Sequence, residues 1–186
     1  MRVIVGISGA SGIIYGVRTL EVLRELNVET HLIITSAAVE IAKAECGLSR
    51  EEIVKLASRC YDVEDLTAPV PSGSFQHDGM VIIPCSMKTL AGIATGYAGN
   101  LLLRAADVSL KERRKLVLVP RETPLNIIHL RNMLTLAEAG AIILPAMPAF
   151  YVKPKSIGDL VNYVVGRVLD HLGISHDLYE RWKAQV

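Results

Sequence analysis

Residues 1–16 read MRVIVGISGASGIIYG, and this stretch decides the fold. A short apolar run, Val3 to Val5, leads into Gly6, Gly9 and Gly12, and an apolar pattern at helical spacing follows directly. This order predicts a strand, a tight turn and the start of a helix. Glycines let the backbone approach a ligand closely, and the free N–H groups at a helix start attract an anion. The turn therefore indicates a phosphate site, and a turn that only packs strand against helix is the alternative.

The glycine spacing separates this turn from the dinucleotide fingerprint. It reads G-x-x-G-x-x-G, whereas dinucleotide sites read G-x-G-x-x-G and place an acidic residue after the second strand to bind a ribose. Here the second expected strand, 29–34, is followed by Thr35 and Ser36. Because hydroxyls suit a phosphate monoester, the sequence favours a mononucleotide such as FMN.

Length, charge and hydropathy narrow the class of protein. The 186 residues suit a single domain covering 1–186, and a net charge of +1 gives no reason to expect broad binding to nucleic acid or a membrane surface. No apolar run is long enough to cross a bilayer, and we expect no signal peptide. The mean hydropathy of +0.35 is high for a small monomer. We therefore expect a homo-oligomer larger than a dimer, and an alanine-rich and leucine-rich core is the alternative.

Cysteines and histidines argue against disulfides and metal. Cys46, Cys60 and Cys85 are an odd number without metal-binding spacing, which favours a reducing, cytoplasmic location. Cys85 has no apparent histidine partner, so we expect a buried apolar side chain rather than a nucleophile. The histidines do not cluster with carboxylates at ligand spacings, and we expect no required metal.

Strand-like runs alternate with helical ones along the chain. Strands are expected at 2–7, 29–34, 79–84, 115–119 and 141–144. Helices are expected at 12–26, 36–45, 50–59, 89–95, 100–112, 126–139 and 156–172. This alternation predicts an α/β fold with a parallel sheet and helices on both faces. Ligands of such sheets bind beyond the carboxyl ends of the strands, and each expected strand is followed there by polar, charged or aromatic residues.

Arg121 and Glu122, after the fourth expected strand, are the sharpest candidate pair. A carboxylate beside a ligand can relay protons while the arginine holds an anion, and an ordinary surface ion pair is the alternative. Pro120 and Pro124 restrict the loop that carries them. After the third expected strand, Ser86 is a natural helix N-cap that can also donate to a flavin or its phosphate.

Further candidates could bind a second anion. Arg104 and Lys111 share one face of a helix and can clamp a phosphate, or they belong to a solvated charged face. Tyr151 can close a pocket or pack in the core. Arg167 lies in an apolar helical run and needs an anionic partner in the site or across an interface. The small turn that begins at Ser72 can also meet a phosphate.

Together the motifs identify a family. The chain resembles the flavin prenyltransferases of the UbiX family in the motifs GASG, SGSF, MVIIPCSMKTL, NLLLRAADVSLKERRKLVLVPRETPL, HLRNMLTL and PAFYVKP. The match runs nearly end to end. It implies a Rossmann-like or flavodoxin-like subunit, commonly in a homododecamer, that binds FMN and dimethylallyl phosphate. These enzymes attach a prenyl group to N5 and C6 of reduced FMN, and the prenylated FMN serves a UbiD-type decarboxylase.

The resemblance also implies site residues, position by position. The flavin site would comprise Gly9, Ala10, Ser11, Thr35, Ser86, Met87, Lys88, Thr89 and Arg121. The prenyl-phosphate site would comprise Ser72, Gly73, Arg104, Lys111, Tyr151 and Arg167. Glu122 matches the family's acid/base glutamate, Ser11 matches a serine near flavin N5, and Glu45 matches a further glutamate near the site.

One departure from the family concerns Leu66, which stands where some members place a tryptophan over the prenyl group. An apolar wall remains, but cation–π help to an allylic cation from that position is lost. Cationic residues would hold the leaving phosphate, and Glu122 or the retained phosphate would accept the proton released on ring closure.

Two other functions stay open at this point, a flavin-dependent cysteine decarboxylase and a flavin carrier without chemistry. The first lacks the expected histidine base, because His77 lies too close to the third strand, and the second does not explain a second anion site.

Overall fold

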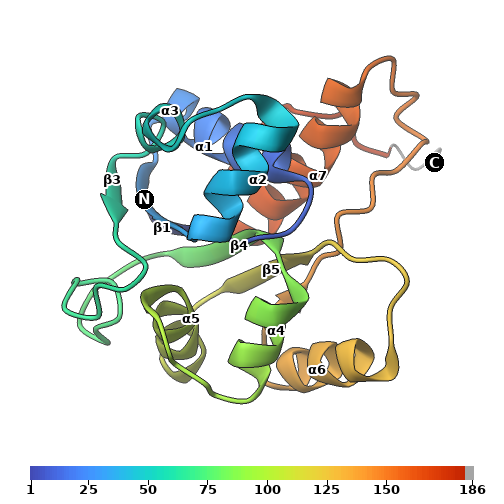
Figure 1. Cartoon of the computed structure of the whole chain (residues 1–186). Helices are drawn as coiled ribbons and strands as arrows, with labels where there is room; N and C mark the ends of the chain where they lie inside the picture. Colours follow the sequence, from blue (N-terminus) through green and yellow to red (C-terminus); the bar gives the residue numbers. More distant parts are fainter. Residues whose placement is uncertain (183–186) are drawn as a thin grey trace.

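Six parallel strands form a single sheet through the middle of the protein (Figure 1). The structure is a computed structural model that describes residues 1–182. The strands are β1 (Arg2–Ile7), β2 (Glu29–Ile34), β3 (Arg59–Tyr61), β4 (Gly79–Cys85), β5 (Leu116–Pro120) and β6 (Ile142–Ile143). Their order across the sheet is β3-β2-β1-β4-β5-β6, and neighbouring strands pair in parallel. This order is that of the doubly wound Rossmann sheet.

Helices cover both faces of the sheet, which confirms the predicted fold class. The helices are α1 (Ile13–Glu25), α2 (Ser36–Cys46), α3 (Arg50–Val54), α4 (Met87–Ala94), α5 (Leu101–Lys111), α6 (Ile127–Glu138) and α7 (Ile157–Leu172). In Figure 1, α1, α2, α3 and α7 lie above the sheet, and α4, α5 and α6 lie below it. Each layer encloses its own hydrophobic cluster.

Alternating side chains of β1 fill the two clusters. Val3, Val5 and Ile7 pack with α1 and α7, whereas Ile4 packs with α4 and α5 on the opposite face. A strand buried on both faces reads as a continuous apolar run, because every side chain must leave water. This is why the opening stretch of the sequence identifies the central strand.

One expected element is wrong, the helix over 50–59. The helix α3 begins with a capping box, in which Ser49 and Glu52 bond each other's backbone N–H groups, but it ends at Val54. The chain then forms β3, which pairs with His31–Ile33 of β2 at the edge of the sheet. Since β3 has only three residues and no apolar alternation, the sequence pattern does not reveal it.

Parallel pairing brings the carboxyl ends of β1, β2, β4 and β5 to the same edge of the sheet. The Ser8 hydroxyl joins two of these ends, because it donates to the Pro84 carbonyl oxygen at 2.9 Å and accepts from the Ser86 N–H at 2.8 Å. Ser8 is fully buried, so its hydroxyl holds the edge together rather than facing a ligand.

Candidate active site

The start of α1, where the glycine turn predicts an anion, already holds a carboxylate of the protein itself. Glu45, at the end of α2, accepts hydrogen bonds at Oε2 from the N–H groups of Gly12 (2.8 Å) and Ile13 (3.2 Å). Burial raises the pKa of the Glu45 carboxyl, but hydrogen bonds from these two N–H groups and from the Ser11 hydroxyl outweigh it and lower the pKa. Glu45 thus supplies the negative charge that this helix start attracts.

A cavity of about 320 Å³ lies at the starts of two other helices, α2 and α4. Its lining includes Gly9, Thr35, Ser36, Ser86, Lys88 and Thr89. Thr35 caps α2 by accepting from the Ala38 N–H at 3.2 Å, and Ser86 caps α4 by accepting from the Thr89 N–H at 3.2 Å. The other N–H groups of these first turns have no helical carbonyl to bond. The cavity therefore offers hydroxyls, N–H donors and the Lys88 ammonium to an anion.

Gly9 allows the glycine turn to close over this cavity. A Cβ atom at Gly9 would lie 2.6 Å from the Cβ of Ala37, in the first turn of α2. Such a contact is too short for any side chain larger than hydrogen. The glycine therefore permits the close approach between the turn after β1 and the start of α2 that shapes one wall of the cavity.

Arg121 and Glu122 line a second cavity of about 270 Å³, together with Pro145 and Met147. The Glu122 carboxylate accepts from the N–H of Thr123 at 2.9 Å and is exposed to solvent. Arg121 lies near the glycine turn, since its positive charge lowers the pKa values of both Glu45 and Tyr15, in each case against the larger effect of burial. The predicted pair thus lies at the same edge as the flavin-site positions.

The predicted prenyl-phosphate positions on the lower face lie along α5 and beside its C-terminal end. A Cβ atom at Gly73 would lie 3.2 Å from Lys111 Nζ, so the Ser72–Gly73 turn and Lys111 are neighbours. Lys111 pairs with Glu112, and Arg104 donates to Asp107 at 2.5 Å. These cations are therefore neutralised by acidic neighbours within one chain.

Tyr151 and Arg167 form a separate group beside α7, on the upper face. Arg167 lies within α7, and its positive charge lowers the pKa of Tyr151, although the larger effect of burial raises it. Because α5 and α7 cover opposite faces of the sheet, one chain does not bring Arg104 and Lys111 to Arg167 (Figure 1). The prenyl-phosphate positions are thus divided in two.

Two further predictions concern Cys85 and metal. Cys85 is fully buried, and burial raises the pKa of its thiol to about 12. It is therefore inert as a nucleophile, as predicted. Within residues 1–182, no group of three or more histidine, cysteine, aspartate or glutamate side chains is placed to hold a metal ion.

A side-chain network around Asp170, near these positions, was not predicted from the sequence. Asp170 binds Tyr179 and Arg181, and the ring of Trp182 lies edge-on to Tyr151 with centroids 5.2 Å apart. Only the spacing of Arg167 and Asp170, one helical turn apart, signals this network in the sequence.

Comparison with known proteins identifies the family. The Flavoprotein family model matches residues 1–169. The flavin prenyltransferase UbiX of Methanocaldococcus jannaschii is 53% identical over 182 residues, which cover 98% of this chain and 98% of that protein. The chain belongs to the flavin prenyltransferase family. Flavin prenyltransferase UbiX of Escherichia coli K12 is 54% identical over 98% of both chains.

Solved structures of UbiX and UbiX-like proteins agree with this membership. The crystal structure of AnUbiX (PadA1) in complex with FMN and dimethylallyl pyrophosphate superposes with a TM-score of 0.97, at 49% identity over 100% of this chain and 98% of that one. A dodecameric FMN-dependent UbiX-like decarboxylase from Escherichia coli O157:H7 gives a TM-score of 0.96, at 51% identity over 99% of this chain and 100% of that one. The resemblance inferred from the motifs is confirmed.

Peptidyl-cysteine decarboxylase EpiD shares only the fold. Its TM-score is 0.66, at 16% identity over 92% of this chain.

Within residues 1–182, the structure has no helix that is long and apolar enough to cross a membrane.

Proposed function

We propose that this protein transfers the dimethylallyl group of dimethylallyl phosphate to N5 and C6 of reduced FMN, without a metal. One observation carries the proposal: a hydroxyl-lined cavity at two helix starts lies at the same edge of the sheet as the Arg121–Glu122 pair. The family membership supports it, because the relatives are flavin prenyltransferases and one of them holds FMN and dimethylallyl pyrophosphate.

FMN fits the carboxyl edge through its phosphate. We propose that the phosphate binds between the starts of α2 and α4, where Thr35, Ser86, Lys88 and Thr89 line the cavity. The α1 start is the less favourable phosphate site, because Glu45 Oε2 already accepts from the N–H groups of Gly12 and Ile13. We place Gly9, Ala10, Ser11, Met87 and Arg121 around the rest of the flavin. Reduced FMN supplies nucleophilic atoms at N5 and C6.

Cationic side chains would hold the leaving phosphate. Arg104, Lys111 and Arg167 stabilise the negative charge that develops as the allylic C–O bond breaks, and Tyr151 adds a hydroxyl donor. The Ser72–Gly73 turn lies beside Lys111 and completes the phosphate cradle. Leu66 and the surrounding apolar side chains would keep water from the allylic cation.

A base must accept the proton released on ring closure. We assign this step to Glu122, because its carboxylate is held by the Thr123 N–H at 2.9 Å and faces a cavity rather than an ion-pair partner. The departing phosphate is the other possible acceptor. Ser11 and Glu45 lie next to each other, and we propose that they orient the flavin near N5.

Neighbouring subunits would complete each site. Arg104 and Lys111 lie on the opposite face from Arg167, so a cradle that contains all three cations requires more than one chain. Large apolar side chains are exposed along α6, in the loop before α7 and at the first residue of α7, among them Ile127, Ile128, Leu134, Phe150 and Ile157. Such surfaces mark subunit contacts. We propose a dodecamer like that of the Escherichia coli O157:H7 relative. Light scattering tests it, and a monodisperse monomer would contradict it.

The proposal also covers the extent of the domain, the cellular location and the enzyme that uses the product. We propose that residues 1–186 form one functional domain, since one sheet organises both hydrophobic clusters. Three free cysteines support a cytoplasmic location. Prenylated FMN made here would serve a UbiD-type decarboxylase, because the prenyltransferase reaction leaves a cofactor that another enzyme must use.

Mass spectrometry of the flavin tests the proposed reaction. The protein is incubated without oxygen with reduced FMN and dimethylallyl phosphate, and the flavin is then extracted. We expect the reduced FMN to gain one C5H8 unit. We also expect a new absorbance of the modified flavin that appears only when the prenyl phosphate is present. FMN recovered unmodified would contradict the transferase and favour a flavin carrier.

A further inference from the structure

Asp170, near the C-terminal end of α7, joins this helix to the chain that follows it. Tyr179 Oη donates to Asp170 Oδ2 at 2.5 Å, and Arg181 Nη2 donates to Oδ1 at 2.7 Å. His176 Nε2 lies 3.2 Å from Oδ1. All three partners belong to residues 174–182, which we call the C-terminal segment. One carboxylate therefore joins three side chains of this segment to α7.

The same carboxylate holds Arg167, one helical turn earlier. Arg167 Nη1 donates to Asp170 Oδ2 at 3.3 Å. The Arg167 side chain is 41% exposed, whereas that of Asp170 is only 18% exposed, so the guanidinium faces outward from a mostly buried partner. A guanidinium has five N–H donors, and this contact uses only one of its nitrogens. A second contact is a side-chain hydrogen bond with Tyr179, which together with Asp170 raises the pKa of Arg167, and the exposed part of the guanidinium can still meet an external anion.

Asp170 is ionised at every physiological pH. Burial raises the pKa of its carboxyl, but hydrogen bonds from Arg181 and Tyr179 and the positive charge of Arg181 outweigh it and lower the pKa to about 2. A charged, mostly buried carboxylate with several donors resists reorientation. Its partners are therefore held in defined positions.

The C-terminal segment packs directly on α7 above Gly166. A Cβ atom at Gly166 would lie 2.6 Å from Tyr179 Cδ1 and 2.8 Å from His176 Cε1, so a larger residue would push the segment away. At its far end the segment reaches the proposed prenyl-phosphate site, where the Trp182 ring lies edge-on to Tyr151. Tyr151, Arg181 and Trp182 line a cavity of about 740 Å³ there.

We propose that Asp170 is a positioning residue for the prenyl phosphate: its carboxylate fixes the Arg167 guanidinium and holds the C-terminal segment beside Tyr151. The inference rests on the function proposed above for Arg167 and Tyr151. A guanidinium fixed before the substrate arrives loses less conformational freedom on binding, which strengthens binding without any new contact. Asp170 acts only through these neighbours.

The test compares Asp170→Asn with Asp177→Asn. Asp177 is an exposed aspartate on the same segment, so the control removes the same charge. The FMN-loaded full-length protein is assayed for KM and kcat with dimethylallyl phosphate, for FMN affinity and for the rate of tryptic cleavage after Arg181. In Asp170→Asn we expect KM to rise about tenfold and cleavage to accelerate about tenfold, with kcat and FMN affinity within about threefold of wild type. Asp170→Glu should recover part of the loss, and Asp177→Asn should match wild type.

A second variant approaches the segment without changing charge. Gly166→Ala should also speed cleavage after Arg181, because its methyl group would displace Tyr179, while it improves the helix propensity of α7. An unchanged KM in Asp170→Asn would overturn the proposal. A fall in FMN affinity and in kcat as large as the rise in KM would also overturn it, since that pattern means Asp170 supports only the fold. If wild-type protein binds FMN but forms no product, the proposed function fails, whereas the cleavage rates still decide whether Asp170 holds the segment.

Discussion

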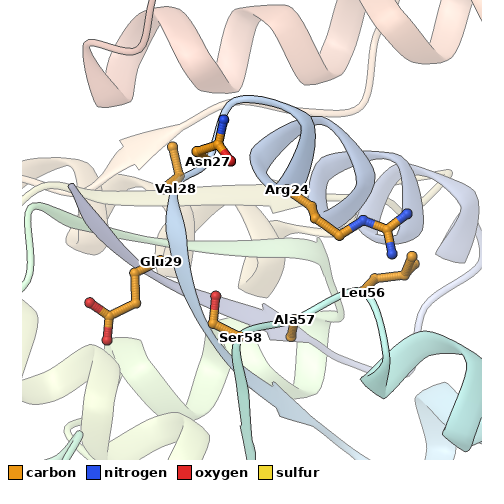
Figure 2. Close-up of a pocket in the computed structure, with 7 residues that line it drawn as sticks. All are labelled: Arg24, Asn27, Val28, Glu29, Leu56, Ala57 and Ser58. Atoms are coloured by element: carbon orange, nitrogen blue, oxygen red, sulfur yellow. The ribbon is translucent and has the colours of Figure 1, made fainter.

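A cavity at the amino edge of the sheet and a cavity at the carboxyl edge differ in the chemistry of their linings. At the amino edge, Arg24, Asn27, Glu29 and Ser58 surround a cavity of about 400 Å³ (Figure 2). At the carboxyl edge, the cavity between α2 and α4 is smaller, at about 320 Å³. Cavity size therefore does not identify the site.

The difference lies in what the polar groups already bind. At the amino edge, Thr30 and Ser58 bond each other reciprocally: the Thr30 N–H donates to Ser58 Oγ at 3.0 Å, and the Ser58 N–H donates to Thr30 Oγ1 at 2.9 Å. Glu29 pairs with Arg2 at 3.1 Å. At the carboxyl edge, two helix starts keep first-turn N–H groups that have no helical partner. First-turn N–H groups without helical partners, rather than volume, distinguish the edge where we propose that the anion binds.

The largest effect is expected from Glu122→Gln at the carboxyl edge. This change keeps the shape and the hydrogen bond to Thr123 but removes the base, so turnover should fall about a hundredfold or more while FMN and prenyl phosphate still bind. Single-turnover absorbance with mass spectrometry of the flavin should detect an intermediate alkylated at N5 and not closed at C6. The exposed glutamate at the end of α6 provides the control, Glu138→Gln. Turnover close to wild type in Glu122→Gln would leave the phosphate as the base.

A smaller effect is expected when one cation is removed from α5 and, as its control, one from the amino-edge cavity. Arg104→Ala should raise the KM for dimethylallyl phosphate about tenfold, since one charge-assisted contact is lost from both binding and the barrier. Arg24→Ala removes the same charge at the amino-edge cavity and should leave KM and kcat unchanged. Equal effects in the two variants, measured by steady-state kinetics, would mean that overall charge rather than a local site attracts the substrate.

The comparison also shows what the sequence can and cannot predict. The apolar runs predict β1, β2, β4 and β5 because these strands are buried on both faces, and the ligand edge follows from their parallel direction. Glu45 at the α1 start could not be derived from local pattern, since its contact with Gly12 spans 33 residues of sequence. The family resemblance alone pointed to Glu45.

The sequence alone could not show that the cationic positions are divided between the two faces of the sheet. Arg104 and Arg167 each lie on an amphipathic helix, and the spacing within one helix does not tell which face of the sheet that helix covers. Only the strand order assigns α5 and α7 to opposite faces. The same limit applies to Asp170, whose partners lie in a segment without helix or strand.

The smallest effect is the change in stability expected at the α1 start, where Glu45→Gln removes the negative charge that faces the N–H groups of Gly12 and Ile13. Because the folded pKa of Glu45 is lowered, its contribution to stability is fully present above its unfolded pKa and is lost as pH falls through the folded value. The variant should lose about 0.5–1 kcal/mol at pH 7, and the difference from wild type should shrink below about pH 4. Urea unfolding at fixed protein concentration measures both, and a difference independent of pH would contradict the charge-based explanation.

FMN titration of two matched serine variants tests the central claim most directly. Ser36→Asp adds a negative charge to the carboxyl-edge cavity, at a helix start where aspartate favours α2 and so does not harm folding. Ser58→Asp adds the same charge to the amino-edge cavity. If the FMN phosphate binds between α2 and α4, Ser36→Asp should weaken FMN binding at least about tenfold through like-charge repulsion, and Ser58→Asp should bind as wild type does. Unchanged affinity in Ser36→Asp, or equal weakening in both variants, would contradict this account.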